Sequence, residues 1–431
     1  MRKTLLPVLS LLIAAAILLG ANGLQNTLLS LRANMEGFSL AWIGFLTSAF
    51  FGGFIAGCRF APRFIMNVGH VRAFTAFASI ASAITLLHSI LVEPAVWLVL
   101  RVIAGFCFAG LQMIIESWLN EKASNANRGQ ILSVYRISDF TAVTAGQFLL
   151  NLADPSGFVL FIIVSVLISI SLVPVALTTS AQPRPIKSAR LDLGRLWRVS
   201  PLAVAAVLGF GIAGSAFWAL IPVVIQDLGY RVSTVALFMS ALILGGAVSQ
   251  WPVGMLSDRL DRRLVIIAIA GGAALAMIAI AFLATVSQGL LVAAGFFIGA
   301  FHLPLFGLGI AHANDYAEED DFVSINGGLL LLYGVGAVLG PILAPLVMGA
   351  GGAQSLFYYC ATVYALVAGF SLYRMTRRKS VPQEDRGDYR SVPSGPAPAV
   401  YDVGLRHDGK AEETGAEAQA DGEAIKDSAV I

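Results

Sequence analysis

Four charged side chains interrupt the long apolar segments of this chain, and all four lie in its first half: Arg101, Glu116, Arg136 and Asp139. A carboxylate beside a guanidinium can form a buried ion pair, and it can exchange a proton when its partner moves away. Glu116 and Arg136 are expected at similar depth on neighbouring helices, with Asp139 one turn beyond Arg136. The pattern predicts a carboxylate, guanidinium and carboxylate triad, which is either a static strut or a proton relay.

Arg101 has no carboxylate expected at its own depth, where Gln147 and Asn151 are the polar residues opposite. With Gln112 and Glu116 it falls within a sector of roughly 80° on one helix, at about 100° per residue. This polar stripe predicts that Arg101 either holds an anionic group of a bound molecule or has a structural or gating role.

Neutral polar residues supply further candidates for binding a small molecule. Asn22, Gln25 and Asn26 share one helical face at i, i+3 and i+4, which suits hydrogen bonds to a neutral or zwitterionic molecule. Trp218 is expected to pack in a core or to line a cavity. His302 precedes Pro304, where a weakened helix exposes backbone groups, although a lone histidine among Phe and Leu is more often structural.

Composition shows what kind of elements must position these residues. The chain is 57% hydrophobic and 13% charged, with a mean hydropathy of +0.79, whereas soluble domains are about 25% charged. About 20 apolar residues span a bilayer, and twelve such runs are predicted, at about 5–30, 39–60, 72–92, 95–119, 130–151, 155–178, 201–225, 233–256, 264–286, 289–312, 323–349 and 354–374. The first run is too long for a signal peptide. An all-α integral membrane protein is expected.

The distribution of basic residues predicts the orientation of these spans. If the N-terminus is cytoplasmic, 24 of the 28 Lys and Arg residues fall on the cytoplasmic side, and the external loops carry only Arg32 and Arg231. Positive charge is retained on the cytoplasmic side of short loops. Both termini are therefore expected in the cytoplasm of a bacterial inner-membrane protein. Since the charge is sorted by side, the net charge of +2 does not indicate nucleic-acid binding.

The chain divides into two similar halves. A basic loop at 179–200 separates bundles expected at 1–178 and 201–379, and the acidic tail at 380–431 is predicted to be disordered. Repeated residues support a duplication. Gly52-Gly53 recurs as Gly245-Gly246 at an offset of 193, while Gly105 and Gly299, Asn120-Glu121 and Asn314-Asp315, and Gly146 and Gly340 recur at 194.

The stretch "GMLSDRLDRR" forms a short cytoplasmic loop between two predicted spans. Gly254 suits a crowded position, while Arg259, Arg262 and Arg263 suit the anionic inner leaflet. Asp258 can accept hydrogen bonds from a neighbouring helix N-terminus, expected around residues 128–130. These charges therefore either fix topology alone or form a latch that closes the cytoplasmic side.

These features resemble the major facilitator superfamily. "GMLSDRLDRR" is similar to its hairpin signature Gly-x-x-x-Asp-Arg-x-Gly-Arg-Arg, with Asp261 in place of the second glycine. The first-half counterpart, "PRFIMNVGHVR", has Met66 where the aspartate belongs, so the latch is expected on one side only. "LVLRVIAG" resembles the arginine-containing fourth-helix motif. "NGLQNTLLSLRA" and "IESWLNE" are similar to a bacterial group whose substrates are mostly unassigned, and the resemblance spans about residues 5–375.

The resemblance implies a monomeric secondary transporter with two pseudo-symmetric six-helix bundles, working by alternating access on a small molecule. Helices 1, 4, 7 and 10 would line its cavity. The expected substrate-binding residues are Asn22, Gln25, Asn26, Arg101, Gln112, Trp218 and His302. Proton coupling would use Glu116, Arg136 and Asp139. A receptor or scaffold that keeps this fold without transporting is the alternative.

Enzymatic and metal chemistry find no support in the sequence. No Walker motif, Ser-His-Asp set or histidine-metal set is visible at workable spacing. Cys58, Cys107 and Cys360 all fall within predicted spans, where buried structural thiols are expected rather than a disulfide or zinc site. Neither a cofactor nor a metal is therefore expected.

Overall fold

The structure is a computed structural model that describes residues 8–122, 128–177, 192–318 and 321–377, together with 381, 382, 386, 387 and 389. Side chains are described at these positions except at 122, 128, 129 and 323. The described first half consists of α2 (Leu9–Met35), α3 (Leu40–Val68), α4 (His70–Ile90), α5 (Pro94–Lys122), α6 (Arg128–Phe148), the 3-10 turn η2 (Leu149–Leu152) and α7 (Val159–Ala176). The second consists of α8 (Leu193–Val199), α9 (Pro201–Asp227), α10 (Val232–Arg259), α11 (Arg262–Leu283), α12 (Gln288–His302), α13 (Pro304–Asn314), α14 (Phe322–Gly351) and α15 (Ser355–Met375).

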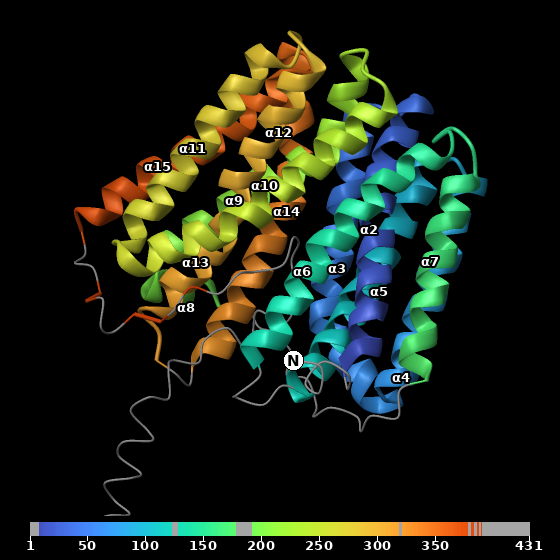
Figure 1. Cartoon of the computed structure of the whole chain (residues 1–431), viewed down its shortest axis with the longest axis horizontal. Helices are drawn as coiled ribbons and strands as arrows, with labels where there is room; N and C mark the ends of the chain where they lie inside the picture. Colours follow the sequence, from blue (N-terminus) through green and yellow to red (C-terminus); the bar gives the residue numbers. More distant parts are fainter. Residues whose placement is uncertain are drawn as a thin grey trace, which may run out of the picture.

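Two helical bundles lie side by side, one built from α2 to α7 and the other from α9 to α15 (Figure 1). In the described part of the chain, eleven helical segments are long and apolar enough to cross a membrane. The twelfth expected span is α6, which is less apolar because Arg136 and Asp139 lie within it. The predicted all-α fold of two six-helix bundles is confirmed.

Three features of the structure add detail to the predicted elements. The span expected at 289–312 is two helices, α12 and α13, which meet at Leu303 because Pro304 has no N–H for a continuous helix. The expected linker loop contains α8, a helix whose first turn is capped by Asp192 accepting from the Arg195 amide. Three described residues of the tail, Arg386, Gly387 and Tyr389, make ordered contacts with the second bundle. Residues 179–191 of the predicted linker, and the predicted tail apart from these three residues, Val381 and Pro382, lie outside the described residues.

Glycine residues let two pairs of helices cross with their backbones in contact, at equivalent places in the two bundles. A Cβ built on Gly53 would lie 1.9 Å from the Val102 carbonyl oxygen where α3 crosses α5. A Cβ on Gly245 would lie 1.9 Å from the Phe296 oxygen where α10 crosses α12. The structural counterpart of Gly53 is therefore Gly245, an offset of 192 (245 minus 53), one residue less than the sequence pairing implied. Only glycine permits such close approach.

The two bundles contact each other at the end of the molecule where α2 and α9 finish, which is the upper end in Figure 1. There Asn34 donates to Gln226 Oε1 over 2.8 Å, which joins α2 to α9. Ser48 on α3 donates to the Val338 carbonyl of α14 over 2.7 Å. One turn above, the missing side chain of Gly44 lets α3 approach the Pro341 carbonyl. The upper end of the space between the bundles is therefore closed by direct helix contacts.

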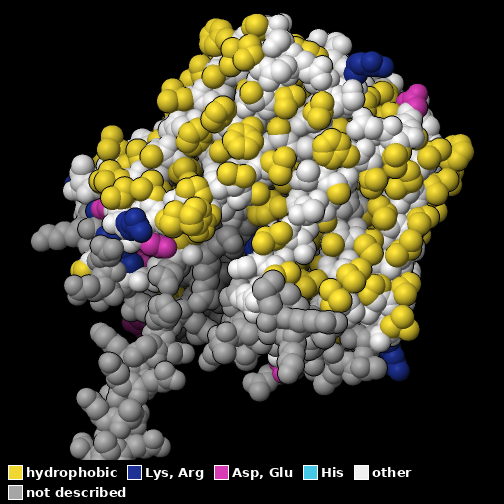
Figure 2. All heavy atoms as spheres, viewed as in Figure 1, with side chains coloured by type: hydrophobic (Ala, Val, Ile, Leu, Met, Phe, Trp, Pro, Cys, Tyr) yellow, Lys and Arg dark blue, Asp and Glu magenta, His cyan; other side chains and the backbone are white. Residues whose placement is uncertain are grey.

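The surface fits a lipid environment. On the face shown in Figure 2, hydrophobic side chains cover the middle of the molecule, and charged side chains gather toward its two ends. Large apolar side chains such as Trp251, Leu275 and Leu346 are exposed. Such an apolar belt matches a hydrocarbon layer about 30 Å thick.

Candidate functional site

A cavity of about 140 Å³ lies between the two bundles. Its walls come from α2, α3, α5 and α6 of the first half and from α9 and α14 of the second. The polar side chains on its wall are Asn22, Asn26, Thr27, Ser30, Thr47, Arg101, Gln112, Asp139 and Ser215. The aromatic ones are Phe50, Phe51, Phe54, Phe108, Tyr135, Trp218 and Tyr333. The cavity combines a large aromatic surface with few charges, as small-molecule sites do.

Arg101 is the basic group on this wall, and it is only 4% exposed. Its Nη2 donates to Asn26 Oδ1 over 2.9 Å, and its guanidinium carbon lies 4.3 Å from the centre of the Phe50 ring. Its Nη1 has no hydrogen-bond partner among the described residues. Gln147, which the sequence placed opposite Arg101, instead accepts from the Thr27 hydroxyl over 2.9 Å. The unused donor of Arg101 makes it a fitting contact for an acceptor on a ligand.

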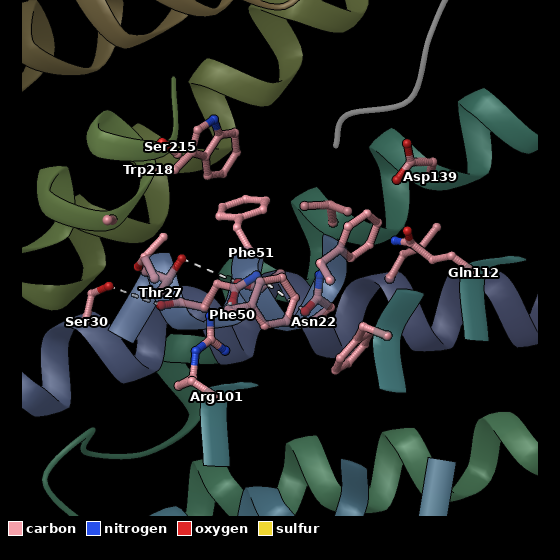
Figure 3. A pocket seen from close by; sticks show the side chains of 18 of the residues that line it. Asn22, Thr27, Ser30, Phe50, Phe51, Arg101, Gln112, Asp139, Ser215 and Trp218 are labelled. Atoms are coloured by element: carbon pink, nitrogen blue, oxygen red, sulfur yellow. Dashed lines mark hydrogen bonds between the residues drawn. The ribbon is translucent and has the colours of Figure 1, made fainter. Parts of the chain in front are cut away.

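Asp139 is the carboxylate on the cavity wall, and it is 1% exposed. Figure 3 shows Asp139 and Gln112 at one end of the cavity, with Arg101 near the other end beside Phe50. Trp218 and Ser215 face Phe51 from the second bundle. The two charges of the cavity are therefore separated along its length, with aromatic side chains between them.

The predicted triad does not form in the expected way. Glu116 and Arg136 are buried, at 2% and 6% exposure, but they do not line the cavity. The hydroxyl of Tyr135 is hydrogen-bonded to Glu116, and the Arg136 guanidinium lies 5.0 Å from the centre of the Tyr135 ring. Nε and Nη1 of Arg136 have no hydrogen-bond partner among the described residues. Tyr135 therefore makes the contact with Glu116 that was expected of Arg136.

Two of the expected substrate-binding residues lie away from the cavity. Gln25 points to α4, where its Nε2 donates to Thr85 Oγ1 over 3.0 Å. His302 hydrogen-bonds through Nδ1 to the Tyr364 hydroxyl over 2.6 Å and stacks on Phe210 with ring centres 4.4 Å apart. Both side chains are packed within the bundles and are absent from the cavity wall, which corrects the sequence expectation. Asn22, Asn26, Arg101, Gln112 and Trp218 do line the cavity.

Sequence reasoning also missed much of the cavity wall. Phe50, Phe51 and Phe54 form one aromatic face of α3, and their spacing of one and four residues was a readable signal. Ser215 lies one turn before Trp218 on α9 and could have been found the same way. Tyr333 gave no such signal, because it sits within an apolar stretch of α14.

The predicted hairpin lies at the lower end of the second bundle and centres on Arg262, which is 2% exposed. Arg262 Nη1 donates to Asp315 Oδ1 over 2.6 Å, and its Nη2 donates to Asp258 Oδ1 over 3.2 Å. Burial raises the pKa of Asp315 to about 6, although Arg262 opposes this shift. Asp261, which replaces a glycine of the signature, caps α11 and binds Arg263 Nη2 over 2.5 Å.

The remaining hairpin residues are placed differently. Gly254 is buried, and Arg259 is exposed to solvent. Asp258 was expected to accept hydrogen bonds from the start of α6, around residues 128–130. That contact stays a prediction.

Comparison with known proteins agrees with this geometry. The sequence profile of the Major Facilitator Superfamily matches residues 11–288 and 203–405. An uncharacterised MFS-type transporter, YcaD of Salmonella enteritidis PT4, is 27% identical over 365 residues, covering 83% of this chain and 93% of its own. The structure resembles the crystal structure of a nucleoside transporter NupG mutant, with a TM-score of 0.73, 15% identity and coverage of 85% and 99%. It also resembles a bacterial Spinster homologue in an inward-facing, unoccupied conformation, with a TM-score of 0.69, 15% identity and coverage of 88% and 98%.

These matches extend over most of both bundles, and the resembling structures are membrane transporters. The glycine crossings repeated in both bundles, and the cavity between the two six-helix bundles, agree with that similarity. The chain is a multi-pass membrane transporter and belongs to the major facilitator superfamily.

Proposed function

We propose that the chain is a secondary active transporter that moves a small amphipathic molecule by alternating access and couples this movement to protons. The cavity between the bundles, with Arg101 and Asp139 on its wall, is the observation that carries the proposal. The upper end of the interface is closed by α2, α3, α9 and α14, so access to the cavity is expected from the lower end. By the distribution of basic residues, that end faces the cytoplasm.

The lining favours a substrate with a planar apolar body and one acceptor or anionic group. Arg101 offers a donor that no described residue uses, in a site shielded from water. Phe50, Phe51 and Trp218 supply flat apolar surface near it. Asn22 and Asn26 add neutral hydrogen-bonding groups, which fix the orientation of a ligand rather than its charge.

Proton coupling is assigned to Asp139, with Glu116 as the second carboxylate of the relay. Asp139 lines the cavity, so its protonation can respond to substrate and to access from one side. Glu116 is hydrogen-bonded to Tyr135, which itself lines the cavity, as Asp139 does. A buried carboxylate is costly to keep charged, so a change in its surroundings favours proton uptake or release.

The test needs a substrate, which a thermal-shift screen of metabolites on the purified protein would provide. In proteoliposomes, Asp139→Asn and Glu116→Gln should keep substrate exchange at equal pH and abolish accumulation driven by a pH gradient. Both steps need the cavity, but only accumulation needs a group that takes up and releases a proton.

Glu93→Gln is the matched control, because Glu93 is an exposed carboxylate at the upper end of α5. Its variant should accumulate substrate as the wild-type protein does. Gradient-driven accumulation that survives in both Asp139→Asn and Glu116→Gln would contradict proton coupling through these acids. Absence of any exchange in the wild-type protein with every stabilising ligand would instead favour a receptor or scaffold.

A further inference from the structure

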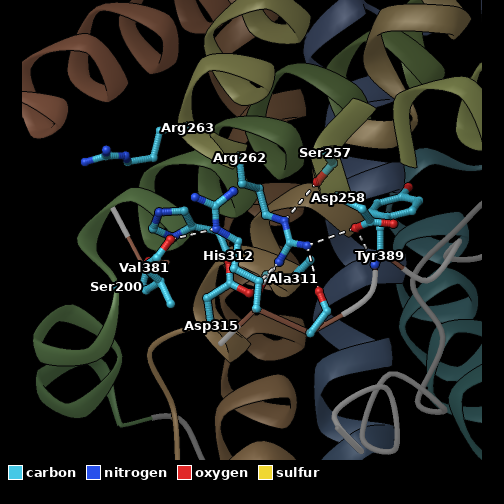
Figure 4. Close-up of polar contacts among 12 residues, drawn as sticks. Ser200, Ser257, Asp258, Arg262, Arg263, Ala311, His312, Asp315, Val381 and Tyr389 are labelled. Atoms are coloured by element: carbon cyan, nitrogen blue, oxygen red, sulfur yellow. Dashed lines mark hydrogen bonds and ion pairs between the residues drawn. The ribbon is translucent and has the colours of Figure 1, made fainter. Parts of the chain in front are cut away.

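The hairpin at the lower end of the second bundle is occupied by a short segment of the chain's own C-terminal region. The residues Arg386, Gly387 and Tyr389 are called here the docked segment. They contact the end of α10, the start of α11 and α13, all far away in the sequence. Figure 4 shows Tyr389 beside Asp258 of the hairpin.

Backbone groups of the docked segment bind the two charged residues at the centre of the hairpin. The Gly387 carbonyl accepts from Arg262 Nη2 over 2.8 Å, shorter than the 3.2 Å contact of the same nitrogen with Asp258. The Tyr389 amide donates to Asp258 Oδ1 over 2.8 Å. With the docked segment in place Arg262 is only 2% exposed, so the Gly387 carbonyl satisfies a charged donor that is shielded from water.

Side chains hold the segment at two further points. The Tyr389 ring lies in a seat made by two glycines: a Cβ on Gly254 would lie 2.5 Å from Tyr389 Cδ1, and one on Gly307 would lie 2.8 Å from its hydroxyl oxygen. Arg386 Nη1 donates to the carbonyl of Leu260, the residue that follows α10, over 2.6 Å. The contact is therefore a shaped site with polar and apolar parts.

The first bundle lacks the residues that form this site. At the repeat offset of 192, Met66 occupies the position of Asp258 and His70 that of Arg262 (258 minus 66, 262 minus 70). His70 lies against Trp118, with ring centres 5.7 Å apart. A segment that binds Asp258 and Arg262 thus has one place to dock, and its effect falls on the second bundle.

We propose that the docked segment is a built-in brake that stabilises the state with the lower end open, because it occupies the hairpin that must meet the first bundle when that end closes. Asp258 Oδ1 already accepts from the Tyr389 amide and from Arg262 Nη2, and the docked segment occupies the side of the hairpin from which the start of α6 would reach this carboxylate. Closure therefore requires the segment to leave the hairpin. The free energy with which the segment binds stabilises the open state relative to the closed state.

Distance measurements between spin labels would test this directly in the full-length protein in lipid nanodiscs, without substrate. Labels at Asn67 and Leu264, exposed residues at the lower ends of α3 and α11, report opening between the bundles. Tyr389→Ala should raise the ratio of closed to open molecules about tenfold, which corresponds to about 1.4 kcal/mol. Arg386→Ala should shift the ratio in the same direction.

Two variants serve as controls. Tyr389→Phe keeps the ring, and its missing hydroxyl has no hydrogen-bond partner among the described residues, so its distances should match the wild type. Tyr401→Ala removes a tyrosine further along the tail and should also match. Distances in Tyr389→Ala and Arg386→Ala that coincide with Tyr401→Ala would overturn the brake, and a shift in Tyr389→Phe equal to that in Tyr389→Ala would overturn the glycine seat. Since no substrate is present, these outcomes are independent of the proposed proton coupling.

Discussion

Arg101 is held at the cavity wall by a neutral amide and an aromatic ring, and not by a carboxylate. An amide partner orients the guanidinium but leaves its charge uncompensated. A buried charge without a counter-charge raises the free energy of the empty site, and binding of an acceptor or anion lowers it. Arg101 is therefore expected to contribute most to ligand affinity, because its neighbours in the protein stabilise its charge only weakly.

Substitution of Arg101 should weaken binding much more than it weakens the fold. For a ligand with an acceptor group, Arg101→Gln is expected to raise Kd about 10-fold to 100-fold, since a hydrogen bond to a charged group contributes about 1.5 to 3 kcal/mol. Titration calorimetry on the purified protein measures the change. Arg231→Gln, at an exposed arginine, is the control. Equal affinity in both variants would remove Arg101 from the binding site.

Asp315 gives the lower end of the second bundle a defined pH dependence. Its pKa in the folded protein is about 6, above the ordinary value of 3.8, because it is buried. The folded state therefore holds more protons than the unfolded state between these values, and stability from this group is full below pH 3.8 and lost as pH rises through 6.

Asp315→Asn should remove that dependence. Between about pH 4 and pH 6 the wild type should lose on the order of 1 to 3 kcal/mol relative to the variant. Thermal unfolding in detergent, followed by tryptophan fluorescence, measures the difference. Asp154→Asn is the control: the Ser156 amide holds the pKa of Asp154 below its usual value, so that carboxylate titrates below the window. Parallel pH curves for wild type and Asp315→Asn would refute the assignment.

Among the elements, the crossings of α3 with α5 and of α10 with α12 set the spacing of the cavity wall. Arg101 and Gln112 lie on α5, and Phe50 and Phe54 lie on α3, so the distance between these two helices fixes how the polar and aromatic groups face each other. Small residues determine that distance because lipid supplies no hydrophobic driving force for helix association.

Gly53→Ala should separate α3 from α5, since the new Cβ would lie 1.9 Å from the Val102 oxygen. We expect a loss of about 1 to 3 kcal/mol in the free energy of unfolding, as overpacked cores show. Gly52→Ala is a control from the adjacent position, because a Cβ there meets nothing within 4 Å. Thermal unfolding of both variants in one detergent provides the measurement. A Gly52 variant as unstable as the Gly53 variant would contradict the crossing.

The sequence predicted the elements well because the physics that defines them is local. Apolar length defines a membrane span, and Gly105 and Gly299 revealed the repeat without knowledge of any contact. Side-chain partners depend on rotation and depth between helices, which the sequence does not contain. Gln25 was therefore assigned to the cavity although it bonds Thr85 on α4, and Tyr135 took the partner expected for Arg136.

At the scale of the whole molecule, the two charged residues on the cavity wall, Arg101 and Asp139, lie in the first bundle, and basic loops are predicted on one side of the membrane. The lower end carries α8, the hairpin and the docked segment. If this end faces the cytoplasm, nearly all the Lys and Arg residues stay on the cytoplasmic side and need not cross the membrane.

Labelling of single cysteines in intact cells would check this orientation. A cysteine at Gln288, an exposed residue at the start of α12, should react with a membrane-impermeant reagent, whereas one at Ser188 in the central linker should not. The native Cys58, Cys107 and Cys360 are buried and provide a low background. Equal labelling at the two positions would reverse or abolish the predicted topology.

The cavity wall contributed by the second bundle consists of Ser215, Trp218, Ala219 and Tyr333, and none of them carries a charge. The groups proposed to exchange protons thus lie in the first bundle together with Arg101, and the second bundle adds a neutral surface for the ligand. Exchange of α9 and α14 between relatives would alter what the protein selects and would leave its proton-handling residues intact. Laboratory evolution can therefore vary one wall of the binding cavity without changing the residues that handle protons.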